Sequence, residues 1–235
     1  MNKVKLYKPF EKWYRGGVIW IYSDPHFSDP DRYLIDKNWP SDEEQVAMIN
    51  HCLGRNDTII FLGDIGNIEV AKQIRGYKVL ILGNHDKGAS NYIKSYTVHS
   101  PGKLDFVTTD LDKAEYDREY RICETSNANV RISNDHLFDE VYEGPLMIND
   151  HIMLSHEPVE LGFGINIHGH EHRRSKVYKR ISPSTVRFNV CSNIIGYHKL
   201  RLDELLMGVE YDDLHRLVID KAIIRKRDID VPSNR

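Results

Sequence analysis

The sequence predicts an α/β fold from three observations. Short apolar runs rich in Val, Ile and Leu recur along the chain, helical patterns separate the first of them, and each run ends in residues able to bind metals or transfer protons. The runs are VIWIYSDPH at 18–26, TIIFLGD at 58–64, KVLILGNHD at 78–86, HIMLSHEP at 151–158 and INIHGHEH at 165–172. Continuous apolar runs of this length are typical of strands buried on both faces. Because open α/β sheets place their sites in loops at the carboxyl ends of strands, we expect the functional residues there.

Two helices are predicted between the first three runs. In SDEEQVAMINHCLG at 41–54, Ser41 and Glu44 are placed to form a capping box, and three apolar residues are spaced to share one buried face. A shorter helix at about 67–75 would connect the second run to the third. These elements give βαβαβ units.

The second half of the chain is predicted to be richer in strands. We expect strands at 175–181 and 185–193, and a meander that begins at 137–144 and continues through PLMIND and HIMLSH, with a turn at 149–150. A short helix at LDELL, a strand near HRLVIDKAII and a frayed basic tail are expected within 201–235. The strands would form a mixed sheet or a two-sheet sandwich flanked by helices.

Composition describes an ordinary soluble globular protein. The 235 residues include 32 Lys and Arg against 35 Asp and Glu, for a formal charge of −3. This balance argues against a dominant basic surface and makes long duplex DNA a poor candidate partner. The three cysteines are far apart in sequence and are expected to be free thiols. We find no apolar core of a signal peptide and no run long enough to cross a membrane, so we expect a cytoplasmic protein without membrane contact.

Polar residues at the ends of the predicted strands form the most informative pattern. They comprise two aspartates, one asparagine and six of the twelve histidines: Asp24, His26, Asp64, Asn84, His85, His156, His168, His170 and His172. Mixed oxygen and nitrogen ligands suit Mn, Fe, Zn, Ni or Co better than Ca or a thiolate-binding metal.

Charge arithmetic indicates what such a site would do. Two divalent ions bring +4, and the carboxylates of Asp24 and Asp64 return −2, so the site would keep a charge near +2. A residual positive centre attracts and polarises a phosphoryl group, and a water between two metals can act as nucleophile without Ser or Cys. The chemistry expected is phosphoester hydrolysis.

Five sequence blocks occur in order and together resemble the calcineurin-like metallophosphoesterases, in particular their small bacterial and phage members. The blocks are D-x-H at 24–26, G-D at 63–64, G-N-H-D at 83–86, the strand-end His156 and G-H-x-H at 169–172. The resemblance implies a four-layer αββα sandwich around a dinuclear metal centre. The chain length favours a single domain over 1–235, and the polar, weakly periodic segment at about 87–135 is expected to be an insertion that is either a solvated loop or a segment contacting substrate.

The resemblance assigns a role to each matched residue. One metal would take Asp24, His26, Asp64 and His172, and the other would take Asp64, Asn84, His156 and His170, with Asp64 as the bridge. The catalytic residues would be His85, as general acid or transition-state stabiliser for the leaving oxygen, and Asp86, which would orient His85. Among the candidate divalent ions Mn is preferred, with Fe, Zn, Ni and Co as alternatives. His168 is expected to be structural or to lie behind the ligands, and glycines 63, 83 and 169 would let backbone crowd the metals.

Departures from the family pattern narrow the expected activity. Protein phosphatases extend G-D into G-D-x-x-D-R-G and read G-N-H-E, whereas here G-D is followed by I-G-N-I and the other block ends in Asp86. A protein phosphatase is therefore disfavoured. Because a histidine at position 85 could protonate a poor alkoxide leaving group, we expect hydrolysis of phosphodiesters, with monoesters second, by attack of a metal-bridging hydroxide. Candidate substrates include nucleotides, nucleic-acid ends and small diesters.

Two alternatives belong to other classes. The chain could be a metal-inert scaffold of the same fold that binds other proteins, or a mononuclear zinc hydrolase that uses only the H-G-H-E-H segment at 168–172. The second alternative lacks the helical H-E-x-x-H spacing. The sequence leaves the oligomeric state open.

Overall fold

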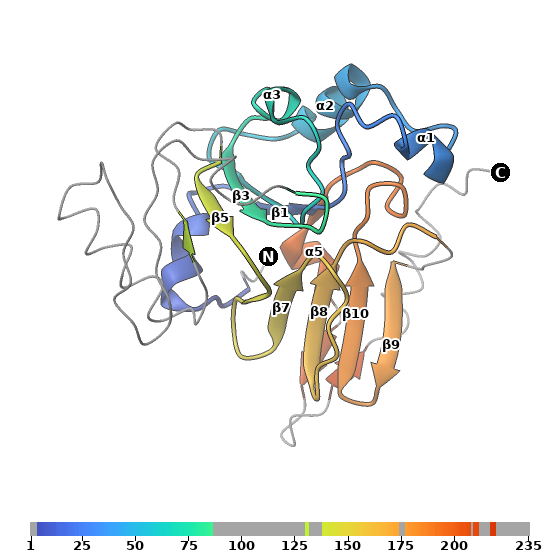
Figure 1. The fold of residues 1–235 in the computed structure, drawn as a ribbon. Coiled ribbons are helices and arrows are strands. Elements are labelled where there is room, and N and C mark those ends of the chain that lie inside the picture. The colour runs from blue at the N-terminus through green and yellow to red at the C-terminus, as the bar shows by residue number, and fades with distance from the viewer. Residues whose placement is uncertain are drawn as a thin grey trace.

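The computed structural model describes residues 4–86, 130–131, 138–173, 177–207, 209–211 and 217–219. Two mixed β-sheets form its main body, and the helices are few and short (Figure 1). The predicted α/β class is confirmed. Among the described residues, no helix combines the length and the apolar character needed to span a membrane.

The first sheet has six strands in the order β11-β1-β2-β3-β5-β4. In chain order these are β1 (Ile19–Tyr22), β2 (Thr58–Phe61), β3 (Tyr77–Ile81), β4 (Val130–Arg131), β5 (Glu140–Tyr142) and β11 (Leu200–Arg201). β1, β2, β3 and β5 run parallel, while β11 and β4 pair antiparallel at the two edges. The predicted succession of parallel strands in the first third of the chain is therefore correct.

The second sheet has five strands in the order β6-β7-β8-β10-β9. They are β6 (Leu146–Met147), β7 (Ile152–Ser155), β8 (Gly164–His168), β9 (Tyr178–Ser182) and β10 (Thr185–Asn189). β8 pairs parallel with both β7 and β10, so these three strands end at the same edge. A separate antiparallel pair consists of β12 (Val209–Tyr211) and β13 (Leu217–Ile219).

The helices connect or flank the parallel strands. α2 (Asp42–Asn50) and α3 (Ile68–Ala71) lie over the six-stranded sheet, on the side away from the second sheet (Figure 1). The predicted capping box of α2 is present, since the Ser41 hydroxyl accepts from the Glu44 amide and the Glu44 carboxylate accepts from the Ser41 amide. α3 covers only part of the predicted 67–75 helix. The remaining short elements are η1 (Lys8–Trp13), α1 (Arg32–Ile35) and α5 (Leu202–Leu205).

The predicted meander at 137–155 is wrong in its first strand. β5 pairs parallel with β3 in the six-stranded sheet, whereas β6 and β7 form an antiparallel pair in the other sheet. The antiparallel pairing of β6 with β7 agrees with the prediction, and so does the turn between them, where the Asn149 side-chain oxygen accepts from the amides of His151 and Ile152. Of the predicted insertion at about 87–135, only β4 lies within the described residues.

One apolar cluster takes in strands of both sheets. Its buried members include Ile21, Ile60 and Val79 from the first sheet and Leu154 and Ile167 from the second. β2 and β8 are buried along their whole length, as expected of strands covered on both faces. The sheets also meet at the ends of β1 and β10, where Ser23 and Cys191 form an isolated parallel bridge. This junction brings the carboxyl ends of strands from both sheets together.

A buried carboxylate fixes the opposite end of the first sheet. Glu140 is fully buried and accepts hydrogen bonds or ion-pair contacts from four side chains: Lys12 at 2.7 Å, Trp13 at 3.2 Å, Tyr77 at 2.6 Å and Tyr142. Burial raises the pKa of Glu140, but the charge and hydrogen bond of Lys12, with the tyrosine hydroxyls, lower it below its ordinary value of 4.5. Glu140 thus joins η1 to β3 and β5.

Replacing Glu140 by glutamine is expected to lower the free energy of unfolding by about 2 kcal/mol at pH 7, since charge-assisted hydrogen bonds are lost. A carboxylate with a depressed folded pKa stabilises fully above its unfolded pKa and less as pH falls through the folded value. The difference between wild type and Glu140→Gln in urea unfolding should therefore shrink below about pH 4.5. Glu43→Gln, at an exposed position of α2, is the control. An undiminished difference at low pH would contradict this role.

Candidate metal centre

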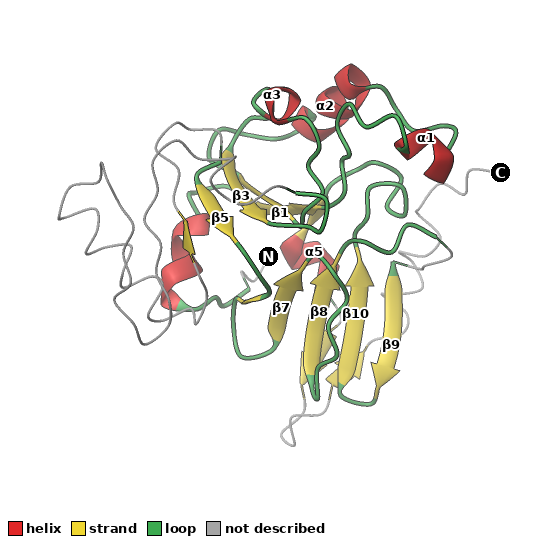
Figure 2. Cartoon of the chain, in the orientation of Figure 1, coloured by secondary structure: helices red, strands yellow, loops and turns green. Residues whose placement is uncertain are grey.

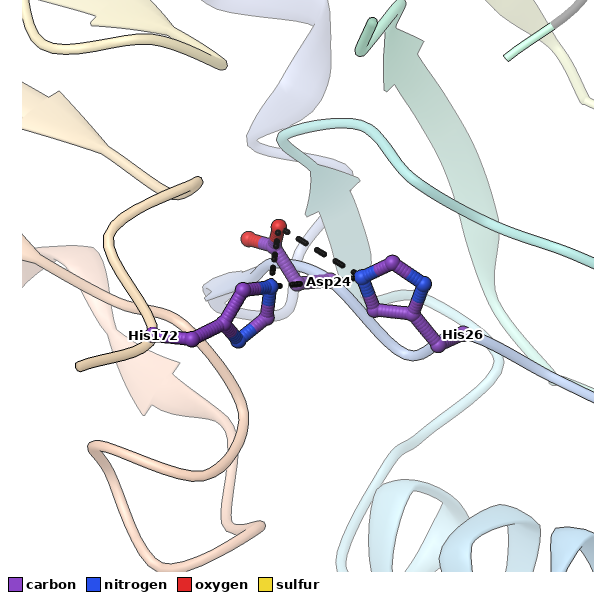
Figure 3. Close-up of side chains that lie close together, drawn as sticks. All are labelled: Asp24, His26 and His172. Carbon is purple, nitrogen blue, oxygen red and sulfur yellow. Dashed lines mark hydrogen bonds and ion pairs between the residues drawn. The ribbon is translucent and has the colours of Figure 1, made fainter. Parts of the chain in front are cut away.

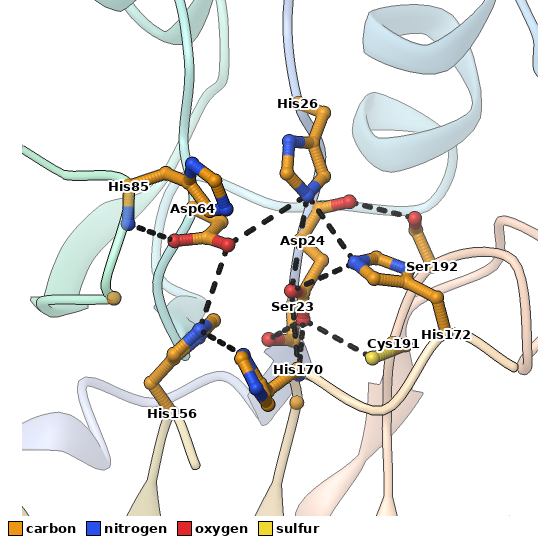
Figure 4. A network of polar contacts seen from close by, with 12 residues as sticks. Ser23, Asp24, His26, Asp64, His85, His156, His170, His172, Cys191 and Ser192 are labelled. Carbon is orange, nitrogen blue, oxygen red and sulfur yellow. Dashed lines mark hydrogen bonds and ion pairs between the residues drawn. The ribbon is translucent and has the colours of Figure 1, made fainter. Parts of the chain in front are cut away.

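Five strands deliver the predicted ligands to one place. The loops that follow β1, β2 and β3 carry Asp24 and His26, Asp64, and Asn84 with His85, and the loops that follow β7 and β8 carry His156, His170 and His172 (Figure 2). Contacts between these side chains connect them into one network (Figure 4). All seven predicted metal ligands therefore lie together, although they span 149 positions of the sequence, from 24 to 172.

One half of the cluster consists of Asp24, His26 and His172 (Figure 3). The Nε2 atoms of the two histidines are 3.3 Å apart, and His172 Nε2 is 3.3 Å from Asp24 Oδ1. His26 Nε2 is 4.0 Å from the same oxygen and 3.7 Å from Asp64 Oδ2. Asp24, His26 and Asp64 are buried, and His172 is half-buried. We refer to Asp24, His26 and His172 as the inner half.

The other half consists of Asn84, His156 and His170, which we call the outer half. His156 Nε2 is 2.7 Å from Asn84 Oδ1, 3.2 Å from His170 Nδ1 and 3.5 Å from Asp64 Oδ2. His170 Nδ1 is 3.0 Å from the same asparagine oxygen. Asn84 and His170 are exposed, so this half faces solvent. Asp64 Oδ2 thus contacts a histidine of each half, which is the placement predicted for a bridging carboxylate.

In their neutral forms, the histidines of the inner half would present lone pairs to one another. His172 Nδ1 lies 2.9 Å from the side-chain oxygen of Asn193, and that oxygen is identified because Asn193 Nδ2 donates to the His172 carbonyl. His26 Nδ1 lies 3.1 Å from the Asp29 carboxylate. Both Nδ1 atoms therefore donate, and in a neutral imidazole the Nε2 atom is then an acceptor. Two such nitrogens 3.3 Å apart repel unless a cation or proton lies beside them.

The same argument applies to His156. Its Nδ1 donates to the carbonyl oxygen of Leu62 at 2.8 Å, because a carbonyl only accepts. In the neutral imidazole its Nε2 is then an acceptor that faces the oxygens of Asn84 and Asp64. Metal-binding histidines commonly have their second ring nitrogen fixed by a carbonyl or carboxylate in this way. The arrangement of acceptors around a common centre fits a pair of cations.

The pKa values of the buried acids follow from the same crowding. Burial raises the pKa of Asp24, but the hydrogen bond of His172 and the charges of His156 and His172 lower it to about 2. Burial lowers the pKa of His172, yet its hydrogen bond and attraction to Asp24 bring it above the ordinary value of 6.5. Burial raises the pKa of Asp64 above its ordinary value. The charge of His156 lowers this pKa, and the charge of Asp24 raises it. Protons would therefore compete with any metal ion for this cluster.

The backbone at the ligands adopts an uncommon conformation. Asp24, His26, Asp64 and His170 have φ angles of 55°, 47°, 52° and 65°, in the left-handed region. Such conformations cost free energy for residues with a Cβ atom and cluster at functional sites. Hydrogen bonds hold the turns in place, since the amides of Asp24 and His26 donate to the carbonyls of Gly63 and Asp64 at 3.1 Å.

The predicted role of glycines in crowding the site agrees with the geometry. A Cβ atom at Gly83 would lie 2.3 Å from Asp64 Oδ1, and one at Gly169 would lie 2.2 Å from Asp24 Oδ2. At Gly63, where φ is 89°, a Cβ atom would lie 2.5 Å from His156 Nδ1. Each glycine thus lets backbone approach a ligand more closely than any side chain would permit.

The two predicted catalytic residues lie beside Asp64. The His85 amide donates to Asp64 Oδ1 at 2.9 Å, and its exposed ring lies 5.9 Å from the His26 ring, centroid to centroid. The Asp86 carboxylate accepts from the amides of Gly83, Asp64 and Ile65 at 2.8–2.9 Å. Asp86 therefore joins the turns that follow β2 and β3 and positions Asp64. That Asp86 also orients the His85 ring stays a prediction.

Several supporting residues were not predicted. Asp24 Oδ2 accepts from the Ser23 hydroxyl, from the His170 amide at 3.0 Å and from Cys191 Sγ at 3.3 Å. Ser192 Oγ donates to the Asp24 carbonyl at 2.7 Å. Cys191, Ser192 and Asn193 follow β10, so the strand-end rule that identified the ligands would also have identified this segment.

His168 lies in β8, as expected of a structural residue. It is buried, and its Nδ1 is 2.8 Å from the Gly169 carbonyl oxygen. Burial lowers the pKa of this histidine.

Comparisons with known proteins leave the function open. No family model matches the chain, and no curated protein matches it. A solved structure with similarity to the chain is that of AQ665 from Aquifex aeolicus, described as a protein of unknown function. It is 17% identical, with a TM-score of 0.49, and the match covers 80% of this chain and 97% of that chain.

Proposed function

We propose that the protein is a calcineurin-like phosphoesterase that uses two divalent metal ions and hydrolyses phosphodiesters in preference to phosphomonoesters. The observation that carries this proposal is the convergence of acceptor atoms from five strand ends on both sides of the Asp64 carboxylate. The two mixed sheets, with α2 and α3 over one of them, support assignment to the four-layer αββα sandwich of that family.

Each ion has a donor set in the proposal. Asp24, His26 and His172 of the inner half would hold one, and Asn84, His156 and His170 of the outer half would hold the other, with Asp64 shared. These oxygen and imidazole donors fit Mn²⁺, and also Fe, Zn, Ni or Co. When bound, such ions polarise a phosphoryl group and lower the pKa of water, which supplies a nucleophile at neutral pH.

With two ions bound, the proposed site would be positively charged and open to solvent. Two carboxylates against two divalent cations leave a positive centre, and the exposed side chains of Asn84 and His170 place it in contact with solvent. An anionic phosphoester would be attracted to this outer half. Of the described Ser and Cys residues that contact Asp24, Ser23 and Cys191 are buried behind its carboxylate and are not placed to act as nucleophiles.

His85 is the proposed proton donor. Its ring is exposed beside the inner half, while its backbone amide is anchored on Asp64. In its protonated form it would donate a proton to the leaving oxygen as the P–O bond breaks, which matters most for an alkoxide. The preferred substrates are therefore diesters, such as nucleotides with a diester bond or the ends of nucleic acids.

The test is hydrolysis of bis-p-nitrophenyl phosphate and p-nitrophenyl phosphate by metal-stripped protein, before and after addition of Mn²⁺. We expect turnover only with metal. When each rate is divided by the rate with free Mn²⁺ alone, the acceleration should be larger for the diester than for the monoester. Folded protein that binds no metal and hydrolyses neither substrate would instead favour the inert scaffold.

A further inference from the structure

An aromatic side chain packs against both histidines of the inner half. The Trp39 ring lies 5.9 Å from the His26 ring, at an interplanar angle of 83°, and 5.9 Å from the His172 ring, at 55°. Trp39 is only 3% exposed. The indole therefore limits the rotation of two imidazoles whose Nε2 atoms face each other at 3.3 Å.

Trp39 is itself held in place by Tyr197 and Asp36. The Tyr197 ring packs on the indole at 5.3 Å, and the Tyr197 hydroxyl donates to the Asp36 carboxylate at 2.6 Å. The Asp36 carbonyl in turn accepts from the Trp39 amide at 3.1 Å. Asp36 thus links the backbone of Trp39 to the residue that supports its ring.

The segment that carries Tyr197 also holds the ligands. Its residue Asn193 fixes His172 Nδ1, and Ser192 Oγ donates to the Asp24 carbonyl. The Tyr197 amide donates to the Ser192 carbonyl at 2.7 Å. Residues 192–197 therefore position Asp24 and His172 directly and support Trp39 from the other side.

The outer half is built differently. There the rings of His156 and His170 pack against each other, with centroids 5.1 Å apart, and His170 is exposed. Support from a buried indole is thus a property of the inner half among the residues that the structure describes.

We infer that Trp39 is a positioning residue for metal binding, because its ring fixes the orientation of His26 and His172. This inference rests on the proposed function, since it assumes that the inner half holds a metal ion. The ring rather than the indole nitrogen carries the role, because Trp39 Nε1 has no hydrogen-bond partner in the described part of the chain.

The experiment compares the affinity for Mn²⁺ of wild type, Trp39→Leu and Trp39→Phe, measured without substrate from the electron paramagnetic resonance of free Mn²⁺. Removing groups that orient metal ligands typically weakens binding by about 10–100-fold. We expect a loss in this range for Trp39→Leu, and recovery to within a few-fold of wild type for Trp39→Phe. The visible absorption of the Co²⁺ form should change in Trp39→Leu alone, because its ligand geometry differs.

Trp20→Leu is the matched control. Trp20 is a half-buried tryptophan of β1 whose Nε1 donates to Asp57 at 3.0 Å, and it contacts no ligand. Urea unfolding of the metal-free variants separates lost stability from lost affinity. If Trp39→Leu does not fold, Tyr197→Leu replaces it, since it keeps the indole and removes the ring behind it.

The outcomes distinguish failure of the inference about Trp39 from failure of the proposed function. Wild-type affinity in Trp39→Leu, or in Tyr197→Leu where that variant replaces it, would overturn the inference. It would also be overturned if Trp39→Phe or Trp20→Leu lost as much affinity as Trp39→Leu. Wild-type protein that binds no Mn²⁺ would instead contradict the proposed function.

Discussion

Replacing Asp64 by asparagine is expected to abolish metal binding and phosphoesterase activity together. Asp64 Oδ2 lies 3.7 Å from His26 Nε2 and 3.5 Å from His156 Nε2, so a single carboxylate oxygen contacts an imidazole of each half. The amide has nearly the same shape but no charge, and each ion would lose its shared anion. Because bound metals contribute several kcal/mol of transition-state stabilisation, we expect activity to fall by about 1,000-fold or more.

Metal content after dialysis and the rate on bis-p-nitrophenyl phosphate are the two readouts for Asp64→Asn. Asp203→Asn serves as control, since Asp203 lies in α5, pairs with Arg201 and is not among the predicted ligands. The bridging role would be wrong if Asp64→Asn kept two metal ions per chain and most of its activity.

Replacing His85 by alanine is expected to separate catalysis from metal binding. The contact of His85 with Asp64 is made by its backbone amide, which alanine retains, so the metal content should not change. The exposed imidazole would be lost, and a general acid typically contributes about 10²–10⁴-fold. We expect a loss in this range for a diester with an alkyl leaving group, and a much smaller loss for an activated monoester such as p-nitrophenyl phosphate, whose leaving group needs no proton.

Rates on an alkyl diester and on p-nitrophenyl phosphate, with metal content measured on the same samples, test the His85 assignment. His51→Ala is the matched control, because His51 is exposed at the far end of α2. Equal losses on both substrates would contradict the role of proton donor, and so would loss of metal from His85→Ala.

The parts of the molecule predicted correctly from the sequence depend on local patterns. The capping box of Ser41 and Glu44 needs only residues three positions apart, and β1, β2 and β3 are continuous apolar runs. The cluster of predicted ligands could be located because parallel strands end at one edge of a sheet, so that Asp24 and Asp64 must be neighbours once β1 pairs with β2.

The parts that were missed depend on tertiary contacts. β5 joins β3 across 58 intervening residues, from 82 to 139, and nothing in its own sequence distinguishes that partner from β6. Trp39 lies between α1 and α2 and belongs to no strand end, so its contact with His26 and His172 follows only from the fold. The short 3₁₀ helix at Lys8–Trp13 spans too few residues to show a helical period.

In the proposed site, seven side chains hold two metal ions, and the Asp64 carboxylate lies between the two donor sets. The most direct test is anomalous X-ray scattering from a crystal of the protein grown with Mn²⁺. We expect two peaks, one on each side of the Asp64 carboxylate: one among Asp24, His26 and His172 and the other among Asn84, His156 and His170. No peak at these residues, or a single peak that leaves either half without an ion at saturating Mn²⁺, would contradict it.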